Sequence, residues 1–312
     1  MSCKSRIGMI DPVEFDICVS KMRDFFKMKG FAEVHTQTRL SILAACEDPS
    51  TISTYDYAGQ VWPLPQTGQM WLEYEMLTNP DKAPGYFCVS TSYRNEPNPV
   101  PGRHDKIFPM FEFELRGTME DLIQLERELL QYIGFKTPRG DTNYPRRKYV
   151  DVANDYGVTE LENEHEEQLE TDYGSVFFLT DFPNYTSPFW NMKQSDDVEG
   201  EAKKVDVIIH GIETIGSAER SCDPAEMKRQ FYTISDGGYS NILFSKFSKE
   251  RVEDELNDFM EHKFFPRAGG GIGVTRMIRA MKLSGLIPER ATLQSVEKNT
   301  QRKPVMQHAE EA

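Results

Sequence analysis

The spacing of hydrophobic residues predicts helices in several parts of the chain. Residues 12–29 carry apolar side chains three and four positions apart, behind Asp11 and Pro12, which are residue types that favour the start of a helix. Gly30 follows as a helix stop. Residues 248–262 show the same amphipathic spacing. We therefore expect both segments to be helices with one buried face.

A third helix is expected over residues 119–134, where leucine and isoleucine recur at helical spacing. Thr118 and Asp121 resemble a capping box at its start, with aspartate in place of the usual glutamate. Residues 160–171 are strongly acidic. We interpret them as a solvated helix, because a run of charge is more often an exposed face than a functional patch.

Other segments have the patterns of strands. Residues 31–37 alternate, whereas residues 175–183 and 204–211 are dominated by apolar side chains. Helices and strands follow one another irregularly, with hairpins between them. This order favours an α+β fold, with an antiparallel or mixed sheet flanked by helices, over a doubly wound parallel sheet. Neither a Walker A sequence nor GxGxxG occurs, so a standard phosphate-binding loop is not expected.

The hairpin predicted over residues 89–117 carries an unusual set of polar residues. Because strand residues alternate between faces, one face would pack against the helix that follows and the other would be a polar floor. The floor and its linking segment contain Arg94, Glu96, Arg103, His104, Phe108, Glu112 and Glu114. Arginine suits phosphate, an aromatic ring suits a base and a carboxylate suits an amine, so the floor fits a nucleotide. An exposed sheet with surface ion pairs is the alternative.

Composition narrows the class of protein. The chain has 312 residues, 38% of them hydrophobic, which is enough for one large domain with a core. A formal net charge of −14 disfavours a broad nucleic-acid-binding face. The five cysteines are scattered without a CxxC pair, which favours neither zinc nor disulfides. We expect a cytoplasmic protein without a membrane span, with one domain over residues 1–291 and a polar, mobile tail over residues 292–312.

The hairpin residues resemble a known motif. SYRNE, followed by GRHDKIFPMFEFE, resembles motif 2 of the class II aminoacyl-tRNA synthetases in their aspartate, asparagine and lysine branch. AGGGIGVTRMIRAM, residues 268–281, resembles motif 3, in which a glycine-rich strand enters a helix that carries an arginine. The resemblance spans residues 11–288 and implies the class II synthetase fold. It also implies an AMP-forming ligase that uses ATP and Mg²⁺ to make an aminoacyl adenylate.

The resemblance assigns roles to individual residues. Arg94 and Arg276 would hold the ATP phosphates and act in catalysis. The other ATP-binding residues would be Glu96, Arg103, His104, Phe108 and Gly273. The amino acid would be bound by Gln69, Glu73, Glu112 and Arg220. In VDVIIHGIETIGSAERS, the carboxylates of Asp206 and Glu213 would bind Mg²⁺, a cation that prefers oxygen ligands.

Glu73 bears on the choice of amino acid. Within PLPQTGQMWLEYEML, related aspartate enzymes have a lysine where this chain has Leu72, and asparagine enzymes have a glutamate where it has Glu73. By charge, Glu73 would repel a second carboxylate and suit an amide. The alternative is a solvated helix residue. Aspartate and asparagine therefore both stay open as the substrate.

The partners implied by the resemblance leave several functions open. KMKGFAEVHTQTRL resembles motif 1 with Gln37 in place of proline, and a homodimer is expected. The pattern begins near residue 1, without an anticodon-binding domain, and GGGIGVTR with Thr275 resembles the ammonia-dependent asparagine synthetases. We expect an asparagine synthetase-like ligase. The alternatives are an asparaginyl-tRNA-synthetase-like ligase that uses tRNA or another acceptor, and a non-catalytic paralogue that binds an amino acid or nucleotide.

Overall fold

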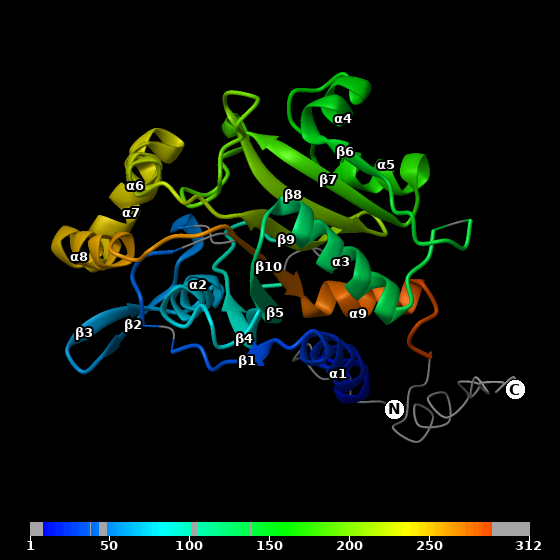
Figure 1. Cartoon of the computed structure of the whole chain (residues 1–312), viewed down its shortest axis with the longest axis horizontal. Coiled ribbons are helices and arrows are strands. Elements are labelled where there is room, and N and C mark those ends of the chain that lie inside the picture. Colours follow the sequence, from blue (N-terminus) through cyan, green and yellow to red (C-terminus); the bar gives the residue numbers. More distant parts are fainter. Residues whose placement is uncertain (1–8, 38, 44–48, 101–104, 138, 289–312) are drawn as a thin grey trace, which may run out of the picture.

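An eight-stranded sheet runs through the part of the chain that the computed structural model describes, residues 9–37, 39–43, 49–100, 105–137 and 139–288 (Figure 1). Neighbouring strands are antiparallel except for the outer pairs β1–β4 and β6–β7, which are parallel. Across the sheet, the strands are β1 (Ala32–Glu33), β4 (Gly85–Tyr93), β5 (Ile107–Arg116), β10 (Arg267–Gly273), β9 (Ile212–Glu219), β8 (Glu201–Ile209), β7 (Val176–Pro183) and β6 (Arg146–Lys148). The expected α+β class with a mixed sheet is confirmed.

One face of the sheet is covered by α1 (Pro12–Met28), α3 (Met119–Ile133) and α9 (Val274–Leu283). These helices pack on alternate strand residues, among them Phe111 and Phe113 of β5, which are fully buried. The aromatic and aliphatic side chains of this face form the main core, as the alternation in the hairpin sequence predicts. The polar residues of β5 therefore lie on the opposite face of the sheet.

The opposite face carries a different set of helices. α2 (Gln69–Thr78) lies over β4 and β5, while α4 (Tyr149–Tyr156) and α5 (Asn163–Tyr173) pack over β7 and β8. Between these two groups, Gly271 and Gly273 of β10 and Gly216 of β9 line a pocket. A hairpin of β2 (Thr54–Tyr57) and β3 (Gln60–Pro63) lies outside the sheet.

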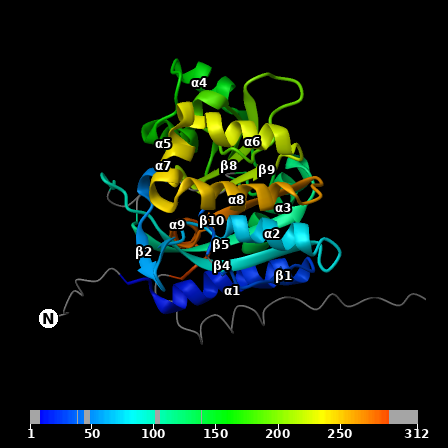
Figure 2. The same cartoon turned by 90° about the vertical axis from the view of Figure 1, so that its left-hand side faces the viewer.

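A further helical layer lies at one end of the molecule. It consists of α6 (Pro224–Thr233), α7 (Gly238–Phe247) and α8 (Lys249–Met260), which lie together in Figure 2. Their apolar faces pack around the buried indole of Trp190. The short 3₁₀ turns are η1 (Pro49–Thr51), η2 (Asn184–Thr186) and η3 (Ile234–Gly237).

The predicted helix starts are confirmed by their hydrogen bonds. The Asp11 carboxylate accepts from the backbone N–H groups of Val13 and Glu14, at 2.9 and 3.1 Å. The Asp121 carboxylate accepts from the backbone N–H of Thr118 at 2.8 Å. Both interactions satisfy donors that a helix start leaves without an intrahelical partner.

Two predicted strand boundaries are wrong. The alternation over residues 31–37 produces only the two-residue β1, because an extended segment becomes a strand only where a partner strand lies beside it, and pairing with β4 stops at Glu33. The segment 204–211 ends earlier than predicted, since His210 and Gly211 both have positive φ and form the turn between β8 and β9.

Some of the residues for which the sequence makes predictions lie outside the part of the chain that the structure describes. Arg103, His104 and the expected tail at 292–312 lie outside the described residues. None of the helices in the described ranges is long and apolar enough to cross a membrane.

Candidate active site

A pocket of about 210 Å³ opens on the sheet face opposite α1 and α3, over β5, β9 and β10. Six of the residues expected to bind ATP or metal line it together: Arg94, Glu96, Phe108, Glu213, Gly273 and Arg276. Asp105 and Thr214 also line the pocket, and sequence reasoning missed both. Residues 182 positions apart along the chain are thus brought to one cavity, as the motif resemblance predicts.

Arg276 and Arg94 supply the positive charge of this pocket. Arg276 lies in the first turn of α9, and its Nη1 donates to the Glu213 carbonyl at 2.7 Å. The Glu213 carboxylate lies 3.7 Å from the same nitrogen. The Arg94 guanidinium lies 5.5 Å from the centre of the Phe108 ring. Two guanidinium groups and a helix N-terminus beside an aromatic face make a cavity suited to a nucleotide phosphate chain and its base.

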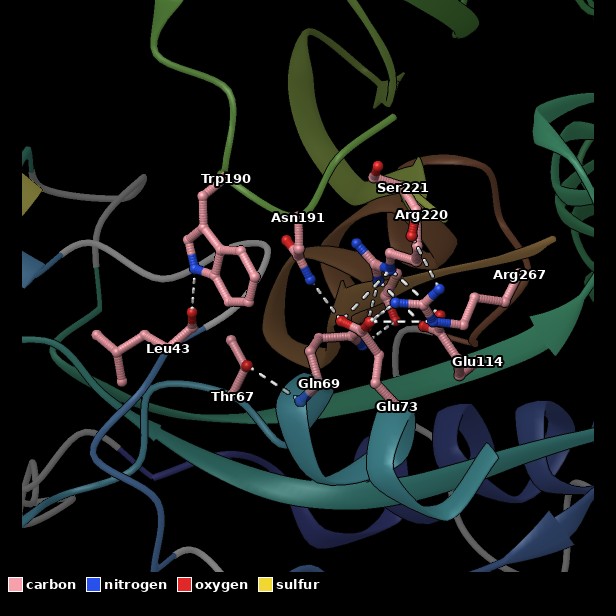
Figure 3. Close-up of polar contacts among 11 residues, drawn as sticks. Leu43, Thr67, Gln69, Glu73, Glu114, Trp190, Asn191, Arg220, Ser221 and Arg267 are labelled. Atoms are coloured by element: carbon pink, nitrogen blue, oxygen red, sulfur yellow. Dashed lines mark hydrogen bonds and ion pairs between the residues drawn. The ribbon is translucent and has the colours of Figure 1, made fainter. Parts of the chain in front are cut away.

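Beyond the pocket, α2 covers a second group of polar residues on the same sheet face. Its charged members are Glu73 from α2, Glu114 from β5, Arg220 from the segment after β9, and Arg267 from β10, all of them fully buried. Gln69 and Asn191 complete the group, which we name the inner polar cluster (Figure 3). It contains two cationic and two anionic side chains, so its charges balance.

Three ion pairs organise the inner polar cluster, the longest of them between Arg220 Nε and Glu73 Oε1 at 3.8 Å. Arg267 donates to Glu73 Oε2 from Nη2 at 2.7 Å and from Nε at 3.2 Å. Arg220 binds both oxygens of Glu114, at 3.1 and 3.2 Å, and its Nη2 donates to Gln69 Oε1 at 2.7 Å. Burial raises the pKa of Glu114 to about 7, although the Arg220 charge lowers it. The guanidinium forks therefore hold both carboxylates in fixed orientations.

The structure brings Gln69, Glu73 and Arg220 together, as the resemblance predicts for an amino-acid site. The interpretation of Glu73 as a solvated helix residue is wrong, because its side chain is fully buried. Sequence reasoning missed Arg267 and Asn191. Arg267 precedes the glycine run at positions 269 and 271 by two and four residues, so the two-residue period of a strand places it on the same face.

Glu112 lies on the same strand face as Glu114 and is also fully buried. Its carboxylate accepts from the Gly68 N–H at 2.8 Å and from the Ser90 hydroxyl at 2.5 Å. Burial raises its pKa, while these hydrogen bonds lower it. The donors are neutral, so the carboxylate keeps the capacity to bind an ammonium group.

The glycines of β10 make room for side chains as well as for a ligand. A Cβ at Gly269 would lie 1.9 Å from Glu114 Oε2 and 2.4 Å from the Phe113 carbonyl oxygen. At Gly271 it would lie 2.7 Å from the Met110 methyl group. The first glycine is therefore required by the inner polar cluster itself, and not only by the close approach of a ligand that the sequence suggests.

Asp206 and Glu213 are the residues expected to bind Mg²⁺. Asp206 does not line the pocket; its Oδ2 accepts from Lys204 Nζ at 2.7 Å, and its buried Oδ1 has no hydrogen-bond partner within the part of the chain that the structure describes. Burial raises its pKa to about 7, although the Lys204 charge lowers it, and the negative charge of Glu213 also contributes to the increase. Across the described ranges, no three potential ligands are grouped for a metal. A carboxylate with a buried unpaired oxygen near a second carboxylate fits the donor chemistry of Mg²⁺.

Comparisons with known proteins agree with this arrangement. Residues 15–289 match the family of tRNA synthetases class II (D, K and N). An aspartate–tRNA(Asp) ligase of Thermoplasma acidophilum is 23% identical over 298 residues, covering 87% of this chain and 64% of its own. An aspartate–tRNA(Asp/Asn) ligase of Methanopyrus kandleri is 23% identical, with 84% and 62% covered. The chain thus spans less than two thirds of the length of these curated relatives.

Solved structures show the same fold. The asparaginyl-tRNA synthetase of Pyrococcus horikoshii, complexed with asparaginyl-adenylate, superposes with a TM-score of 0.70 at 19% identity, covering 89% of this chain and 68% of the other. The Entamoeba histolytica asparaginyl-tRNA synthetase, also with asparaginyl-adenylate, gives a TM-score of 0.67 at 18% identity, with 87% and 63% covered. With its eight-stranded sheet, its pocket over the glycine-rich strand and a family match over nearly all described residues, this chain belongs to the class II tRNA synthetases of the D, K and N group.

Proposed function

We propose that this protein uses ATP to activate aspartate or asparagine as an aminoacyl adenylate and transfers the aminoacyl group to a nitrogen acceptor, as an AMP-forming asparagine synthetase does. The observation that carries the proposal is the pairing of two adjoining sites. One is the arginine-lined pocket over Gly271 and Gly273, and the other is the buried inner polar cluster beside it. A phosphate chain fits the first, and the small polar head of an amino acid fits the second.

The reaction needs positioning and charge stabilisation. A carboxylate oxygen of the amino acid attacks the α-phosphorus of ATP, a new phosphorus–oxygen bond forms, and the bond to pyrophosphate breaks. Arg94 and Arg276 stabilise negative charge on the phosphates, and the Phe108 ring stacks on the base. When bound by Asp206 and Glu213, Mg²⁺ supplies further positive charge for the leaving pyrophosphate. No covalent enzyme intermediate is needed.

The amino acid is held by residues on both sides of the glycine strand. Glu112, whose hydrogen bonds come from neutral groups, binds the substrate ammonium. Arg220 and Glu73 bind the polar end of the substrate, with Gln69 holding Arg220 in place at 2.7 Å. These assignments are supported by burial and charge, because an ammonium ion is a natural counter-charge for a buried carboxylate whose hydrogen bonds come from neutral groups.

The acceptor defines two versions of the function. The segment GGGIGVTR, with Thr275 in the pocket wall, favours ammonia as the acceptor and aspartate as the substrate. The charge balance of the inner polar cluster favours a neutral carboxamide, and therefore asparagine with tRNA or another acceptor, because a buried carboxylate would add an uncompensated charge.

The deciding experiment is ATP–pyrophosphate exchange with each of the twenty standard amino acids, with and without ammonia and tRNA. Exchange with aspartate, together with ammonia-dependent release of AMP, would establish the asparagine synthetase version. Exchange with asparagine alone would establish the second version. Absence of exchange with every amino acid would overturn the proposed ligase activity and favour a non-catalytic amino-acid- or nucleotide-binding protein.

We also propose that the protein is a homodimer, which the partial match of residues 27–40 to the dimer motif of the family supports. Light scattering coupled to size exclusion should give twice the monomer mass. A monomer mass at micromolar concentration would contradict this part of the proposal.

A further inference from the structure

Asn191 is fully buried in the inner polar cluster, but only half of its carboxamide is satisfied. Its Nδ2 donates to Glu73 Oε1 at 2.5 Å, whereas its buried Oδ1 has no hydrogen-bond partner among the described residues. Figure 3 shows the nitrogen turned toward Glu73 and the oxygen turned away from it. A buried carbonyl oxygen without a donor is costly, and native proteins rarely keep one without a reason.

The orientation of this carboxamide is set by its neighbour. An ionised carboxylate only accepts hydrogen bonds, and Arg267 binds Glu73 as a charged pair at 2.7 Å. Turning the Asn191 amide over would place its oxygen against Glu73 Oε1, which has no proton to donate. Glu73 therefore holds Asn191 with its acceptor presented away from the ion pairs.

The backbone around Asn191 leaves it little freedom to move away. The neighbouring Trp190 donates from its indole to the Leu43 carbonyl at 2.7 Å. The Asn191 carbonyl accepts from the Ser221 N–H at 2.8 Å, and Met192 forms a β-bridge with Arg220. Asn191 is thus fixed beside the proposed amino-acid-binding residues, with one vacant acceptor.

We propose that Asn191 Oδ1 is a specificity-determining contact that accepts a hydrogen bond from an N–H group of the amino-acid substrate. This assignment rests on the proposed function. The donor is either the side-chain carboxamide of asparagine or the ammonium group of aspartate, which share the same chemistry. A neutral acceptor suits both, because the ion pairs of Glu73 with Arg267 and Glu114 with Arg220 already balance the local charge.

The test combines variants with substrate analogues in the exchange assay. Asn191→Leu has a similar size but no acceptor. For asparagine, the analogue is aspartate β-methyl ester, which lacks the side-chain N–H; for aspartate, it is succinate, which lacks the ammonium group. The KM of the amino acid is compared with the inhibition constant of its analogue, in the wild type and in the variant, and the KM of ATP is measured alongside.

If the contact exists, Asn191→Leu should raise the amino-acid KM about tenfold to a hundredfold and leave the KM of ATP unchanged. The wild type should prefer the amino acid over the analogue that lacks the contacted nitrogen, and in the variant this preference should be smaller by about the same factor. The reason is that the variant and the analogue each remove the same hydrogen bond. If the preference falls for asparagine over aspartate β-methyl ester, the donor is the side-chain carboxamide. If it falls for aspartate over succinate, the donor is the ammonium group. A purely structural role would change both ligands equally.

Two further variants keep the result interpretable. Asn191→Ser retains a polar group that is too short to reach both Glu73 and a substrate, and it replaces the leucine variant if that protein does not fold. Asn79→Leu is the control, because Asn79, which caps the C-terminal end of α2 outside the cluster, also donates from Nδ2 to a glutamate of α2, Glu75, at 3.1 Å. It should leave every constant unchanged.

The outcomes separate the two levels of the inference. Wild-type exchange, together with unchanged discrimination in both analogue arms of the Asn191 variants, would overturn the role of Asn191 and leave the proposed function intact. Lack of exchange by the wild type with any amino acid would overturn the proposed function and this assignment with it.

Discussion

Arg276 illustrates how one side chain joins two parts of the site. It lies in the first turn of α9, lines the proposed nucleotide pocket, and donates a hydrogen bond to the Glu213 carbonyl of β9. We expect Arg276→Ala to lower the ATP–pyrophosphate exchange rate at least about a hundredfold, because a charge-stabilising donor is lost. The circular dichroism spectrum should not change, since the side chain is 31% exposed.

Arg279→Ala is the matched control for this prediction. Arg279 lies one turn later on α9 and also binds a backbone carbonyl, that of His210 at 3.1 Å, but it does not line the pocket. The ATP–pyrophosphate exchange rate of the Arg279→Ala variant should stay within a few-fold of the wild-type rate. Equal rates for the Arg276 variant and the wild type would remove Arg276 from the proposed mechanism.

The buried Glu73–Arg267 pair is expected to contribute to stability. Both side chains are fully buried, so Glu73→Gln would leave the Arg267 charge without its counter-charge and should lower the free energy of unfolding by roughly 3–5 kcal/mol. The double variant Glu73→Gln/Arg267→Met should recover much of this loss, because no charge remains unpaired. Urea unfolding measures both values.

An exposed pair provides the comparison. Arg229 lies 3.5 Å from Glu226 and is 66% exposed, so Arg229→Ala should cost less than about 1 kcal/mol. If the double variant of the buried pair were less stable than either single variant, the charge argument for the inner polar cluster would be wrong.

At the scale of elements, the start of α3 depends on one carboxylate. Asp121 accepts from the Thr118 N–H and from its hydroxyl, at 2.8 and 2.9 Å. We expect Asp121→Ala to lower the free energy of unfolding by about 1 kcal/mol, whereas Asp121→Asn, which keeps an acceptor, should lower it less. Equal losses in the two variants, measured by urea unfolding, would show that the acceptor does not matter.

Between about pH 4.5 and pH 8, the buried carboxyl of Glu126 is expected to lower the stability of the whole molecule as the pH rises. This α3 carboxyl is fully buried against the sheet, and burial raises its pKa from 4.5 to about 8, although the Ser217 hydroxyl lowers it. The folded state therefore binds a proton that the unfolded state releases. The stabilisation that comes from this bound proton is fully present below about pH 4.5 and is lost as the pH rises to about 8.

Glu126→Gln should remove this pH dependence, which is at most about 1.4 kcal/mol per pH unit. The free energy of unfolding of the variant relative to the wild type should increase between pH 5 and pH 8. Glu120→Gln on the same helix, with a side chain that is 70% exposed, is the control and should leave the slope unchanged. If the free energy of unfolding changed with pH in the same way for the wild type and for Glu126→Gln, the raised pKa of Glu126 would be contradicted.

The sequence by itself determined the local features of this protein. The helix starts at Asp11 and Thr118 depend on neighbours within three residues, and the two faces of β5 follow from alternation, so both were predictable from short windows. The grouping of Arg94, Phe108, Gly273 and Arg276 in one pocket was predictable too, because these residues belong to recognisable motifs. A short stretch of sequence does not show how far a neighbouring strand pairs with it. For this reason β1 is shorter than the alternating pattern of residues 31–37 predicts.

Only the tertiary structure decided the inner polar cluster. Glu73 meets Arg267 across 194 positions and Asn191 across 118, and Gln69 reaches the Gly270 carbonyl across 201. A periodic pattern tells which face a residue occupies, but it does not tell which distant residue shares that face. Burial then changes the chemistry, because carboxylates that would be solvated in a helix or hairpin must find cationic or hydrogen-bonding partners once water is excluded.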